Sequence, residues 1–297
     1  MSGTSKDALD GGLYVFEESQ KSFTFHHLQS INFSKQYKNF QSTELINEEI
    51  TNKSIELVKK ILEQVKHIPS GIAFSGQTIK HTDSQSLQAG NPQLIADSTG
   101  IKVYSDFRNW DIKNGGKGAP LIPAFHEFLF SEGAETKLII NIGGIANGTF
   151  LNDGEIVLAS DVGPGNCLID FVMAERFNKP FDDKGDEASR GEINQELLNE
   201  LRSSCNDMQY PRADDKQSYY ELINNSFYEI QSSSVLRTLT EFTAEKIVEF
   251  YKFCKEPDEV IIHGGGTKNL YLMNLIKTKI SGTLKTTEDK IPSKFVF

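Results

Sequence analysis

Three glycine-rich segments carry the residue types that bind phosphate. They are SGTS at 2–5, NIGGIANGT at 141–149 and HGGGTKN at 263–269, each beside a predicted strand. Glycine lets the backbone approach an anion closely, so that its N–H groups donate to phosphate oxygens. None contains a Walker or G-x-G-x-x-G sequence, and each alone is more simply a turn. Together, at strand ends across one chain, they favour a nucleotide held by several contacts.

The carboxylates near these segments suggest a base and a metal ligand. Asp161 ends the predicted strand EIVLASD before a Gly-Pro-Gly turn, and a side chain fixed there suits a general base. A turn-forming Asp that accepts local N–H bonds is the alternative. Asp7 and Asp10 follow the first glycine segment, where carboxylates often hold Mg²⁺. By themselves these two are also explained as surface loop residues.

Residues 105–126, SDFRNWDIKNGGKGAPLIPAFH, combine charge, glycine and proline most densely. Arg108 is suited to clamp a carboxylate through two parallel hydrogen bonds. An internal ion pair with Asp106 or Asp111 explains the arginine equally well. The GGKGAP sequence and the prolines after it predict a shaped loop rather than a helix interior.

Predicted strands and helices interleave along the chain. Apolar runs bounded by glycine or polar clusters predict strands at 13–16 and 22–28, which suggest a hairpin-like beginning. Further strands are predicted at 71–76, 102–107, 136–151 (two strands and a turn), 155–161 and 258–266. Helical periodicity predicts helices at 42–65, 91–100, 167–177, 193–202, 219–230, 233–254 and 269–280. This order is typical of α/β folds, and we expect two lobes with a cleft between them.

Composition narrows the class of protein. The chain has 297 residues, 38% of them hydrophobic, and a formal net charge of −10. An acidic chain gains nothing from counterion release, so we expect no nucleic-acid partner. No run of eighteen apolar residues and no signal peptide is seen, so no membrane partner is expected either. Cys167, Cys205 and Cys254 lack zinc-ligand spacing and predict reduced thiols in a cytoplasmic protein.

Nine segments in order resemble one family, the anhydro-N-acetylmuramic acid kinases, sugar kinases of the actin, hexokinase and heat-shock ATPase superfamily. The segments are MSGTSKDALD (1–10), SGQTIKH (75–81), LQAGNPQLIADSTGI (87–101), residues 105–126, NIGGIAN (141–147), DVGPGNCLID (161–170), FDDKGDEASRG (181–191), LTEFTA (239–244) and HGGGTKN (263–269). They span the chain from the first residue nearly to the last.

The resemblance implies an α/β, two-lobed actin-like ATPase fold, each lobe a ribonuclease-H-like mixed sheet flanked by helices. We expect residues 1–135 to form the N-terminal lobe and 136–297 the C-terminal lobe. The implied reaction converts ATP, water and 1,6-anhydro-N-acetylmuramic acid to N-acetylmuramic acid 6-phosphate and ADP, with Mg²⁺. It would serve amino sugar metabolism in peptidoglycan recycling, and a homodimer would be in keeping with the family.

The resemblance also implies a role for particular residues. Asp161 matches the catalytic base. For the metal ligand we take Asp7, from its place beside the first glycine segment. Two loops would contact the phosphates: the first is Gly3, Thr4, Ser5, Lys6, Asp7, Ala8, Leu9 and Asp10, and the second is Asn141, Gly143, Gly144 and Asn147. The adenosine would be contacted by Gly264, Gly265, Gly266 and Asn269. The sugar would be contacted by Arg108, Gly118, Ala119 and Pro120. The substrate's lactyl carboxylate gives an acidic protein a reason to keep Arg108 in its cleft.

Several features depart from the family pattern. Lys6 and Ala8 stand at hydrophobic and glycine positions, Ser75 at a histidine, and 210–220 lacks a Lys-Ser-Gly pattern. The family has a strand before the first loop and a helix with a sugar-contacting glutamate after residue 297. We therefore expect a truncated sequence, with weakened or absent kinase activity if this is the whole chain. The alternatives are a related sugar kinase and a catalytically weak or silent nucleotide-binding relative.

Overall fold

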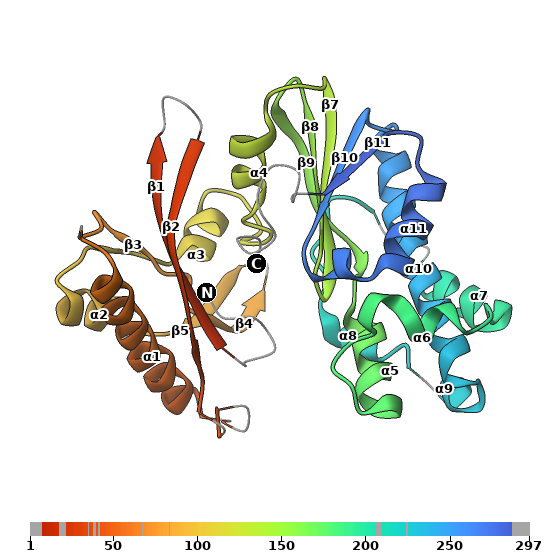
Figure 1. The fold of residues 1–297 in the computed structure, drawn as a ribbon, viewed down its shortest axis with the longest axis horizontal. Coiled ribbons are helices and arrows are strands. Elements are labelled where there is room, and N and C mark those ends of the chain that lie inside the picture. The colour runs from red at the N-terminus through yellow and green to blue at the C-terminus, as the bar shows by residue number, and fades with distance from the viewer. Residues whose placement is uncertain are drawn as a thin grey trace. The chain divides into compact units, whose positions relative to one another are not determined.

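The computed structural model describes residues 8–17, 22–34, 36–37, 40, 42–66, 68–82, 84–205, 209–223 and 225–286. The chain divides into two compact units, Met1–Leu121 and Ile122–Phe297 (Figure 1). Residues 122–135, which the sequence assigned to the N-terminal lobe, belong to the second unit by this division. Where the functional lobes divide stays a prediction.

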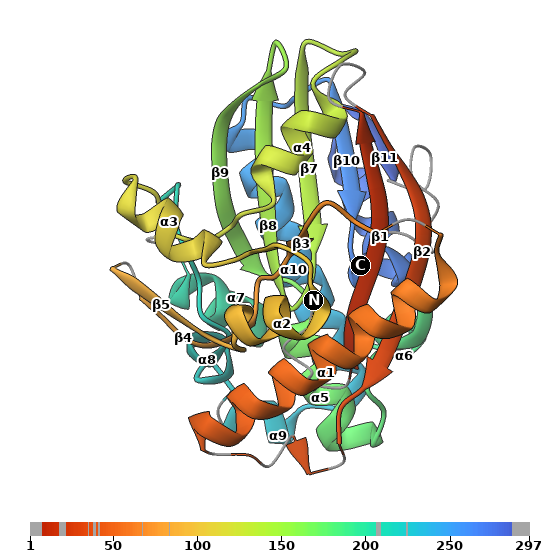
Figure 2. The same cartoon turned by 90° about the vertical axis from the view of Figure 1, so that its left-hand side faces the viewer.

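The first unit begins with a β-hairpin and a long helix. Strands β1 (Ala8–Glu17) and β2 (Ser22–Asn32) pair antiparallel, as predicted. Helix α1 (Thr43–Gln64) runs across them (Figure 2) and buries Ile46, Ile50, Leu57 and Ile61 in the same core as Leu9. The helix starts after Ser42, whose hydroxyl accepts a hydrogen bond from the Leu45 N–H group, as an N-cap residue does.

The other strands of this unit are short. Strands β3 (Ile72–Ala73) and β6 (Val103–Tyr104) pair parallel, and β4 (Gln77–Thr82) and β5 (Gln85–Ala89) pair antiparallel. Helices α2 (Pro92–Thr99) and α3 (Phe107–Lys113) follow β5 and β6. The described strands thus form three two-stranded sheets, where the resemblance implied one mixed sheet.

The described strands of the second unit form one mixed sheet. Strands β7 (Thr136–Ile142), β8 (Ile145–Asn152) and β9 (Glu155–Pro164) pair antiparallel, while β10 (Glu259–His263) and β11 (Thr283–Thr286) add parallel to β7. The order is β11-β10-β7-β8-β9. With helices on its faces, this sheet confirms the predicted α/β class.

Both faces of this sheet are covered. Helices α10 (Ser232–Phe253) and α11 (Leu270–Lys279) pack on one face, over Leu138, Ile140 and Ile142 (Figure 1). Helix α4 (Pro123–Phe130) lies on the other and brings Phe130 against Ile139. Burial on both faces explains why β7 is an almost continuous apolar run. Because side chains alternate along a strand, Asn141 lies on the same face as Ile139.

Five further helices among the described residues form a second core together with α10. They are α5 (Cys167–Phe177), α6 (Asp186–Ser189), α7 (Gln195–Ser204), α8 (Lys216–Tyr220) and α9 (Asn225–Glu229). The short helices η3 (Asp183–Gly185) and η4 (Gly265–Lys268) contribute none of the described residues of this core. Residues 219–230, predicted as one helical stretch, belong to two short helices. Asp215 caps the first by accepting from the Gln217 N–H group, so α8 starts earlier than predicted. Helix α4 was expected to be loop; Pro123 opens it because its missing N–H is needless in the first turn.

Candidate active site

A row of polar side chains crosses the mixed sheet of the second unit. His263 pairs in register with Asn141, Asn141 with Asn147, and Asn147 with Asp161. Residues directly opposite in register share a face of the sheet, so three separate sequence predictions meet on one surface. Oδ1 of Asn147 is buried and has no hydrogen-bond partner in the described part of the chain. A buried acceptor of this kind requires a partner, which a ligand would supply.

Asp161 lies within β9 rather than at its end. The strand continues to Pro164, with a bulge where Ala146 pairs with Gly163 and Asn147 with Asp161. The Asp161 N–H group donates to the Arg212 carbonyl at 3.0 Å, and Oδ2 of Asp161 accepts from the Asp214 N–H group at 2.8 Å. The alternative of a turn-forming Asp does not describe this side chain, because its hydrogen-bond donor is distant in sequence.

Burial raises the pKa of Asp161 to about 6. The hydrogen bond from the Asp214 N–H group and the charge of Arg212 oppose the rise, while the charge of Asp214 adds to it. A carboxylate with this pKa is ionised at neutral pH and is more basic than an exposed one. Both properties suit a general base.

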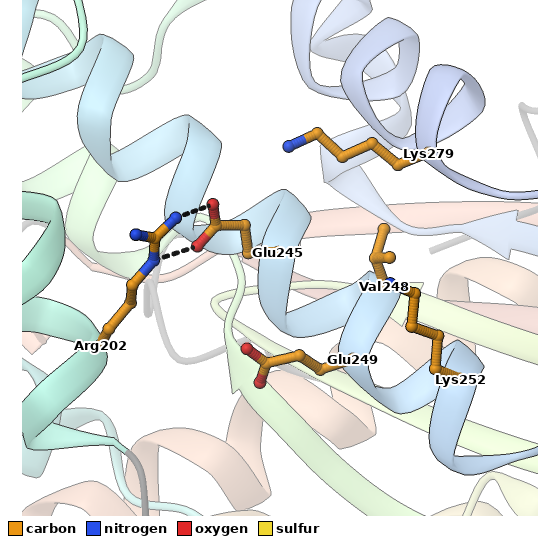
Figure 3. A pocket seen from close by; sticks show the side chains of 6 residues that line it. All are labelled: Arg202, Glu245, Val248, Glu249, Lys252 and Lys279. Atoms are coloured by element: carbon orange, nitrogen blue, oxygen red, sulfur yellow. Dashed lines mark hydrogen bonds and ion pairs between the residues drawn. The ribbon is translucent and has the colours of Figure 1, made fainter. Parts of the chain in front are cut away.

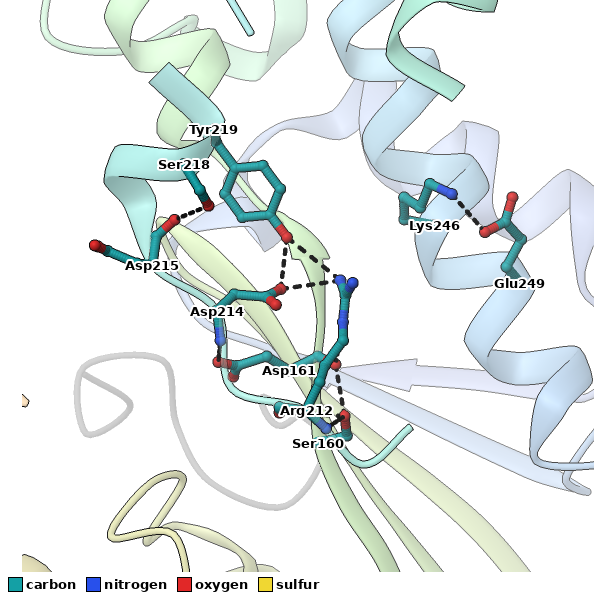
Figure 4. Close-up of polar contacts among 9 residues, drawn as sticks. All are labelled: Ser160, Asp161, Arg212, Asp214, Asp215, Ser218, Tyr219, Lys246 and Glu249. Atoms are coloured by element: carbon teal, nitrogen blue, oxygen red, sulfur yellow. Dashed lines mark hydrogen bonds and ion pairs between the residues drawn. The ribbon is translucent and has the colours of Figure 1, made fainter. Parts of the chain in front are cut away.

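An ion-pair network beside Asp161 was not predicted from the sequence. The Arg212 guanidinium lies 2.9 Å from Oδ2 of Asp214, and the Tyr219 hydroxyl donates to the same oxygen at 2.5 Å (Figure 4). These residues come from the segment 210–220, noted above only as a departure from the family pattern. The sequence signal for this network was the charge-rich run RADDK, which is equally typical of a solvent-exposed loop.

The predicted second phosphate loop is the turn between β7 and β8, and it is tied to helix α5. The N–H groups of Gly165 and Cys167 donate to the Gly144 carbonyl, both at 3.0 Å, and that of Asn166 donates to the Gly143 carbonyl at 2.8 Å. The turn is therefore held by the two residues that lead into α5 and by its first residue, Cys167, whose N–H group has no partner inside the helix.

Lys216 brings a cation to this turn. Its Cε and Nζ atoms occupy the space that a side chain on Gly144 would fill, so the lysine lies directly against the turn. Burial raises the pKa of Asp170, on α5, to about 6, and the charge of Lys216 opposes that rise. The sequence analysis did not single out Lys216. Its position adds a positive charge beside a predicted phosphate loop that has no charged residue of its own.

The predicted adenosine segment follows β10. Gly264 has φ of 91°, and a side chain there would meet Oδ1 of Asn141. Gly266 packs on Ile142, whereas among the described residues a Cβ on Gly265 would meet only Nδ2 of Asn166, at 3.9 Å. No other described residue fills the space over Gly265, which leaves room there for a ligand. Asn269 has a structural task already, because its Oδ1 accepts from the Leu272 N–H group and caps α11.

The first predicted phosphate loop lies mostly outside the described residues. Gly3, Thr4, Ser5, Lys6 and Asp7 are among those not described. Ala8, Leu9 and Asp10 are the first residues of β1, and Leu9 is buried in the core of its unit. Within the described residues, no group of three His, Cys, Asp or Glu side chains could hold a metal ion.

The predicted sugar segment forms helix α3 and the loop after it. Arg108 donates from Nη1 to the Gly118 carbonyl at 2.7 Å, and the Gly118 N–H group donates to Oδ2 of Asp111 at 2.7 Å. Asp106 accepts instead from Nδ2 of Asn109, at 2.6 Å. No ion pair joins Arg108 to either aspartate among the described residues. Ala119 and Pro120 continue the same loop, and both are partly buried.

A charged surface pocket of about 460 Å³ lies on the second unit and contains none of the predicted residues (Figure 3). It is lined by Arg202, Glu245, Val248, Glu249, Lys252 and Lys279. Arg202 pairs with Glu245 through Nε and Nη2, at 2.9 and 2.5 Å, and Lys279 pairs with Glu241. Arg202 and Glu245 thus pair within the pocket, while Lys279 and Glu249 pair with Glu241 and Lys246, which do not line it.

Comparison with known proteins decides the family. A family model described as anhydro-N-acetylmuramic acid kinase matches residues 1–294. The chain belongs to the anhydro-N-acetylmuramic acid kinase family. A relative of that name from the gamma-proteobacterium EBAC31A08 is 32% identical, with 97% of this chain and 85% of the relative covered. Another, from Shewanella baltica OS155, is 35% identical, with 97% and 84% covered.

Among solved structures, component A of (R)-2-hydroxyglutaryl-CoA dehydratase from Acidaminococcus fermentans matches with a TM-score of 0.48 and 11% identity, over 94% of this chain and 87% of that one. Membership of the anhydro-N-acetylmuramic acid kinase family confirms the predicted class of enzyme, a sugar kinase, and does not favour the nucleotide-binding alternative. It also supports the predicted use of ATP and of a small sugar substrate. None of the described helices combines the length and apolarity of a membrane span.

Proposed function

We propose that this chain uses ATP and water to convert 1,6-anhydro-N-acetylmuramic acid to N-acetylmuramic acid 6-phosphate, as a step of peptidoglycan recycling. The observation that carries the proposal is the row Asn141–Asn147–Asp161 on one face of the sheet. It places a partly buried carboxylate of raised pKa on the same surface as a glycine turn suited to phosphate. A kinase that also hydrolyses its substrate needs both.

Asp161 acts as the general base of this reaction. It takes a proton from the water that attacks the anomeric carbon, and the C1–O bond of the anhydro bridge breaks. The bridge oxygen, which stays bonded to C6, attacks the γ-phosphorus of ATP, and ADP leaves. Phosphoryl transfer needs in-line positioning and charge stabilisation more than covalent help, so the base is the side chain on which chemistry depends most.

The nucleotide is held by the residues of the two described glycine segments. The open space over Gly265 and the unpaired Oδ1 of Asn147 fit a polar ligand on this surface. Gly143 and Gly144, beside Lys216, face the phosphates, and Gly264 to Gly266 with Asn269 lie along the adenosine. Residues Gly3 to Asp10 complete the phosphate site.

Mg²⁺ accompanies ATP and neutralises phosphate charge. Asp7 is the side chain proposed to hold it, and Asp7 lies outside the described residues.

The sugar is bound by the segment after β6. Arg108 pairs with the lactyl carboxylate of the substrate, and Gly118, Ala119 and Pro120 form the wall of that site. The hydrogen bond from Nη1 to the Gly118 carbonyl links the guanidinium to this wall. Nη2 and Nε have no partner among the described residues, so they are available to a carboxylate.

The cellular setting is proposed as cytoplasmic, because the three cysteines are all free and buried, as in proteins of a reducing compartment. The homodimer that the resemblance implies stays a prediction, which sedimentation equilibrium would test.

The test is conversion of 1,6-anhydro-N-acetylmuramic acid with ATP by wild type, Asp161→Asn and Asp153→Asn. Asp161→Asn is expected to lower kcat by roughly 10²- to 10⁴-fold with unchanged melting. Asp153, in the β8–β9 turn with φ of 49°, makes a matched control because asparagine tolerates that conformation. Full activity of Asp161→Asn would remove the assigned base. Failure of the wild type to form the sugar phosphate would remove the proposed function.

A further inference from the structure

Resting on the proposed role of Asp161, we propose that Arg212, Asp214 and Tyr219 form a positioning network that leaves Oδ1 of Asp161 as the oxygen that receives the proton. The three residues lie far from Asp161 in sequence and meet it at the outer edge of β9 (Figure 4). In the proposed mechanism, none of these three residues reacts with the substrate or contacts it.

The backbone of Asp161 and one of its carboxylate oxygens are held by this segment. The Arg212 carbonyl accepts from the Asp161 N–H group at 3.0 Å, and Nε of Arg212 donates to the Asp161 carbonyl at 3.3 Å. Ser160 closes the arrangement, since its hydroxyl accepts from the Arg212 N–H group at 2.9 Å. The Asp214 N–H group then donates to Oδ2 of Asp161 at 2.8 Å. Oδ1 has no partner among the described residues.

The peptide that binds Oδ2 is itself fixed by a buried ion pair. The side chains of Arg212 and Asp214 are 11% and 10% exposed and lie 2.9 Å apart. Tyr219, 2% exposed, donates its hydroxyl to Asp214 at 2.5 Å. Burying both charges costs desolvation energy, so net stabilisation is a poor reason for such a pair. What the pair provides is a fixed position for the Asp214 N–H group.

The network also places opposite charges near the base. Arg212 and Asp214 are the charged groups that act on Asp161, and Arg212 favours its ionised form while Asp214 disfavours it. On α10, which packs against β9, Lys246 and Glu249 pair with each other at 2.8 Å. Removing one member of the Arg212–Asp214 pair therefore leaves the other charge uncompensated beside Asp161.

This arrangement predicts pH shifts of opposite sign. Asp214→Asn leaves Arg212 unopposed, so the acid limb of kcat/KM should move to lower pH by about one unit. Arg212→Met leaves Asp214 unopposed, so the limb should move to higher pH by a similar amount. Arg212→Lys keeps the charge and should return the limb toward wild type. Tyr219→Phe changes no charge and should leave the limb in place, with kcat lowered roughly tenfold because the peptide is less firmly held.

The experiment measures kcat/KM from pH 4.5 to 8.5 for the wild type and these variants, with circular dichroism and melting temperature to confirm folding. Opposite shifts support the network. Unmoved limbs, or shifts of one sign in both charge variants, overturn it, since a merely structural role has no reason to produce opposite signs. If Arg212→Met does not fold, the comparison of Asp214→Asn with Tyr219→Phe tests the network: the acid limb should move to lower pH in the first variant and stay in place in the second. An acid limb that persists in Asp161→Asn refutes the base itself, which separates failure of the proposed function from failure of the network.

Discussion

His126 and His263 contact each other across the second unit, with their Nε2 atoms 2.9 Å apart. Nδ1 of His126 lies 2.8 Å from the Thr149 hydroxyl, so α4 is joined to β8 and β10 through one imidazole. Burial and the nearby His263 lower the pKa of His126 to about 3, and burial lowers that of His263 to about 4. Both histidines are neutral at physiological pH, and His263 stands one residue before Gly264.

Acid is expected to destabilise the fold through this pair. The unfolded chain binds protons on both histidines below about pH 6.5, while the folded chain does not, so stability is full above that pH and falls as pH drops toward 4. Each histidine should cost on the order of 1 kcal/mol per pH unit. Asp161 and Asp170 act in the opposite sense, because burial raises their pKa values and the folded state binds their protons more readily.

Urea unfolding at pH 7.5 and 5.0 separates these contributions when wild type is compared with His126→Gln. The variant should lose part of the pH dependence of the free energy of unfolding. His81→Gln, on the β4–β5 hairpin, is the matched control for loss of a histidine outside this pair. Equal pH dependence in wild type and His126→Gln would contradict the assignment.

The rate of sugar phosphorylation should fall as the solution is acidified, and at a higher pH than an ordinary aspartate base would give. A base must be ionised to act, and Asp161 ionises as pH rises through about 6. The acid limb of kcat/KM is therefore expected near pH 6 rather than near 4. A profile that stays flat from pH 7 down to 5, on enzyme shown to remain folded, is incompatible with this role.

Two neighbouring glycines should respond differently to alanine. Gly264→Ala forces φ of 91° on a residue with a side chain and brings it against Asn141, so we expect a loss of about 1–3 kcal/mol in stability. Gly265→Ala meets open space, so its stability should stay within about 0.5 kcal/mol of wild type. If a nucleotide covers Gly265, its alanine variant instead raises KM for ATP. An unchanged KM would place the adenosine elsewhere.

Arg108→Met should weaken binding of the acidic sugar in particular. Losing a charged hydrogen bond to the lactyl carboxylate raises KM by roughly tenfold to a hundredfold. Arg108→Lys should recover part of this, because it keeps the charge but not the two-pronged geometry. The control substrate is 1,6-anhydro-N-acetylglucosamine, which lacks the lactyl group. Equal losses on both sugars would show that Arg108 supports the loop through Gly118 and does not recognise the carboxylate.

Local signals made much of the fold predictable. The bounds of α5, Cys167–Phe177, agree with prediction because a Gly-Pro-Gly turn precedes the helix and Asn178, in a left-handed conformation, ends it. The β1–β2 hairpin and the buried strands β7 and β10 were equally clear from apolar runs. The β4–β5 hairpin was missed because its sequence is polar and alternates weakly.

The candidate site was only partly predictable, because its decisive contacts join distant residues. Fifty-three positions separate Asp161 from Asp214, and 137 separate His126 from His263. Local periodicity and turn chemistry carry no information on such pairs. Residue patterns at strand ends, and then the family resemblance, pointed to Asp161 and the glycine segments. The network around Asp161 lies where this chain departs from the family pattern and became visible only in three dimensions.

The hydrogen bonds between the β7–β8 turn and helix α5 set the smallest unit that can be exchanged with a relative. Gly165, Asn166 and Cys167 donate to the carbonyls of Gly143 and Gly144, so the backbone geometry of each segment depends on that of the other. A chimera that imports a foreign turn must therefore import the first turn of α5 with it. In recombination libraries built from this family, crossovers between residues 144 and 165 should be the ones that most often yield inactive enzyme.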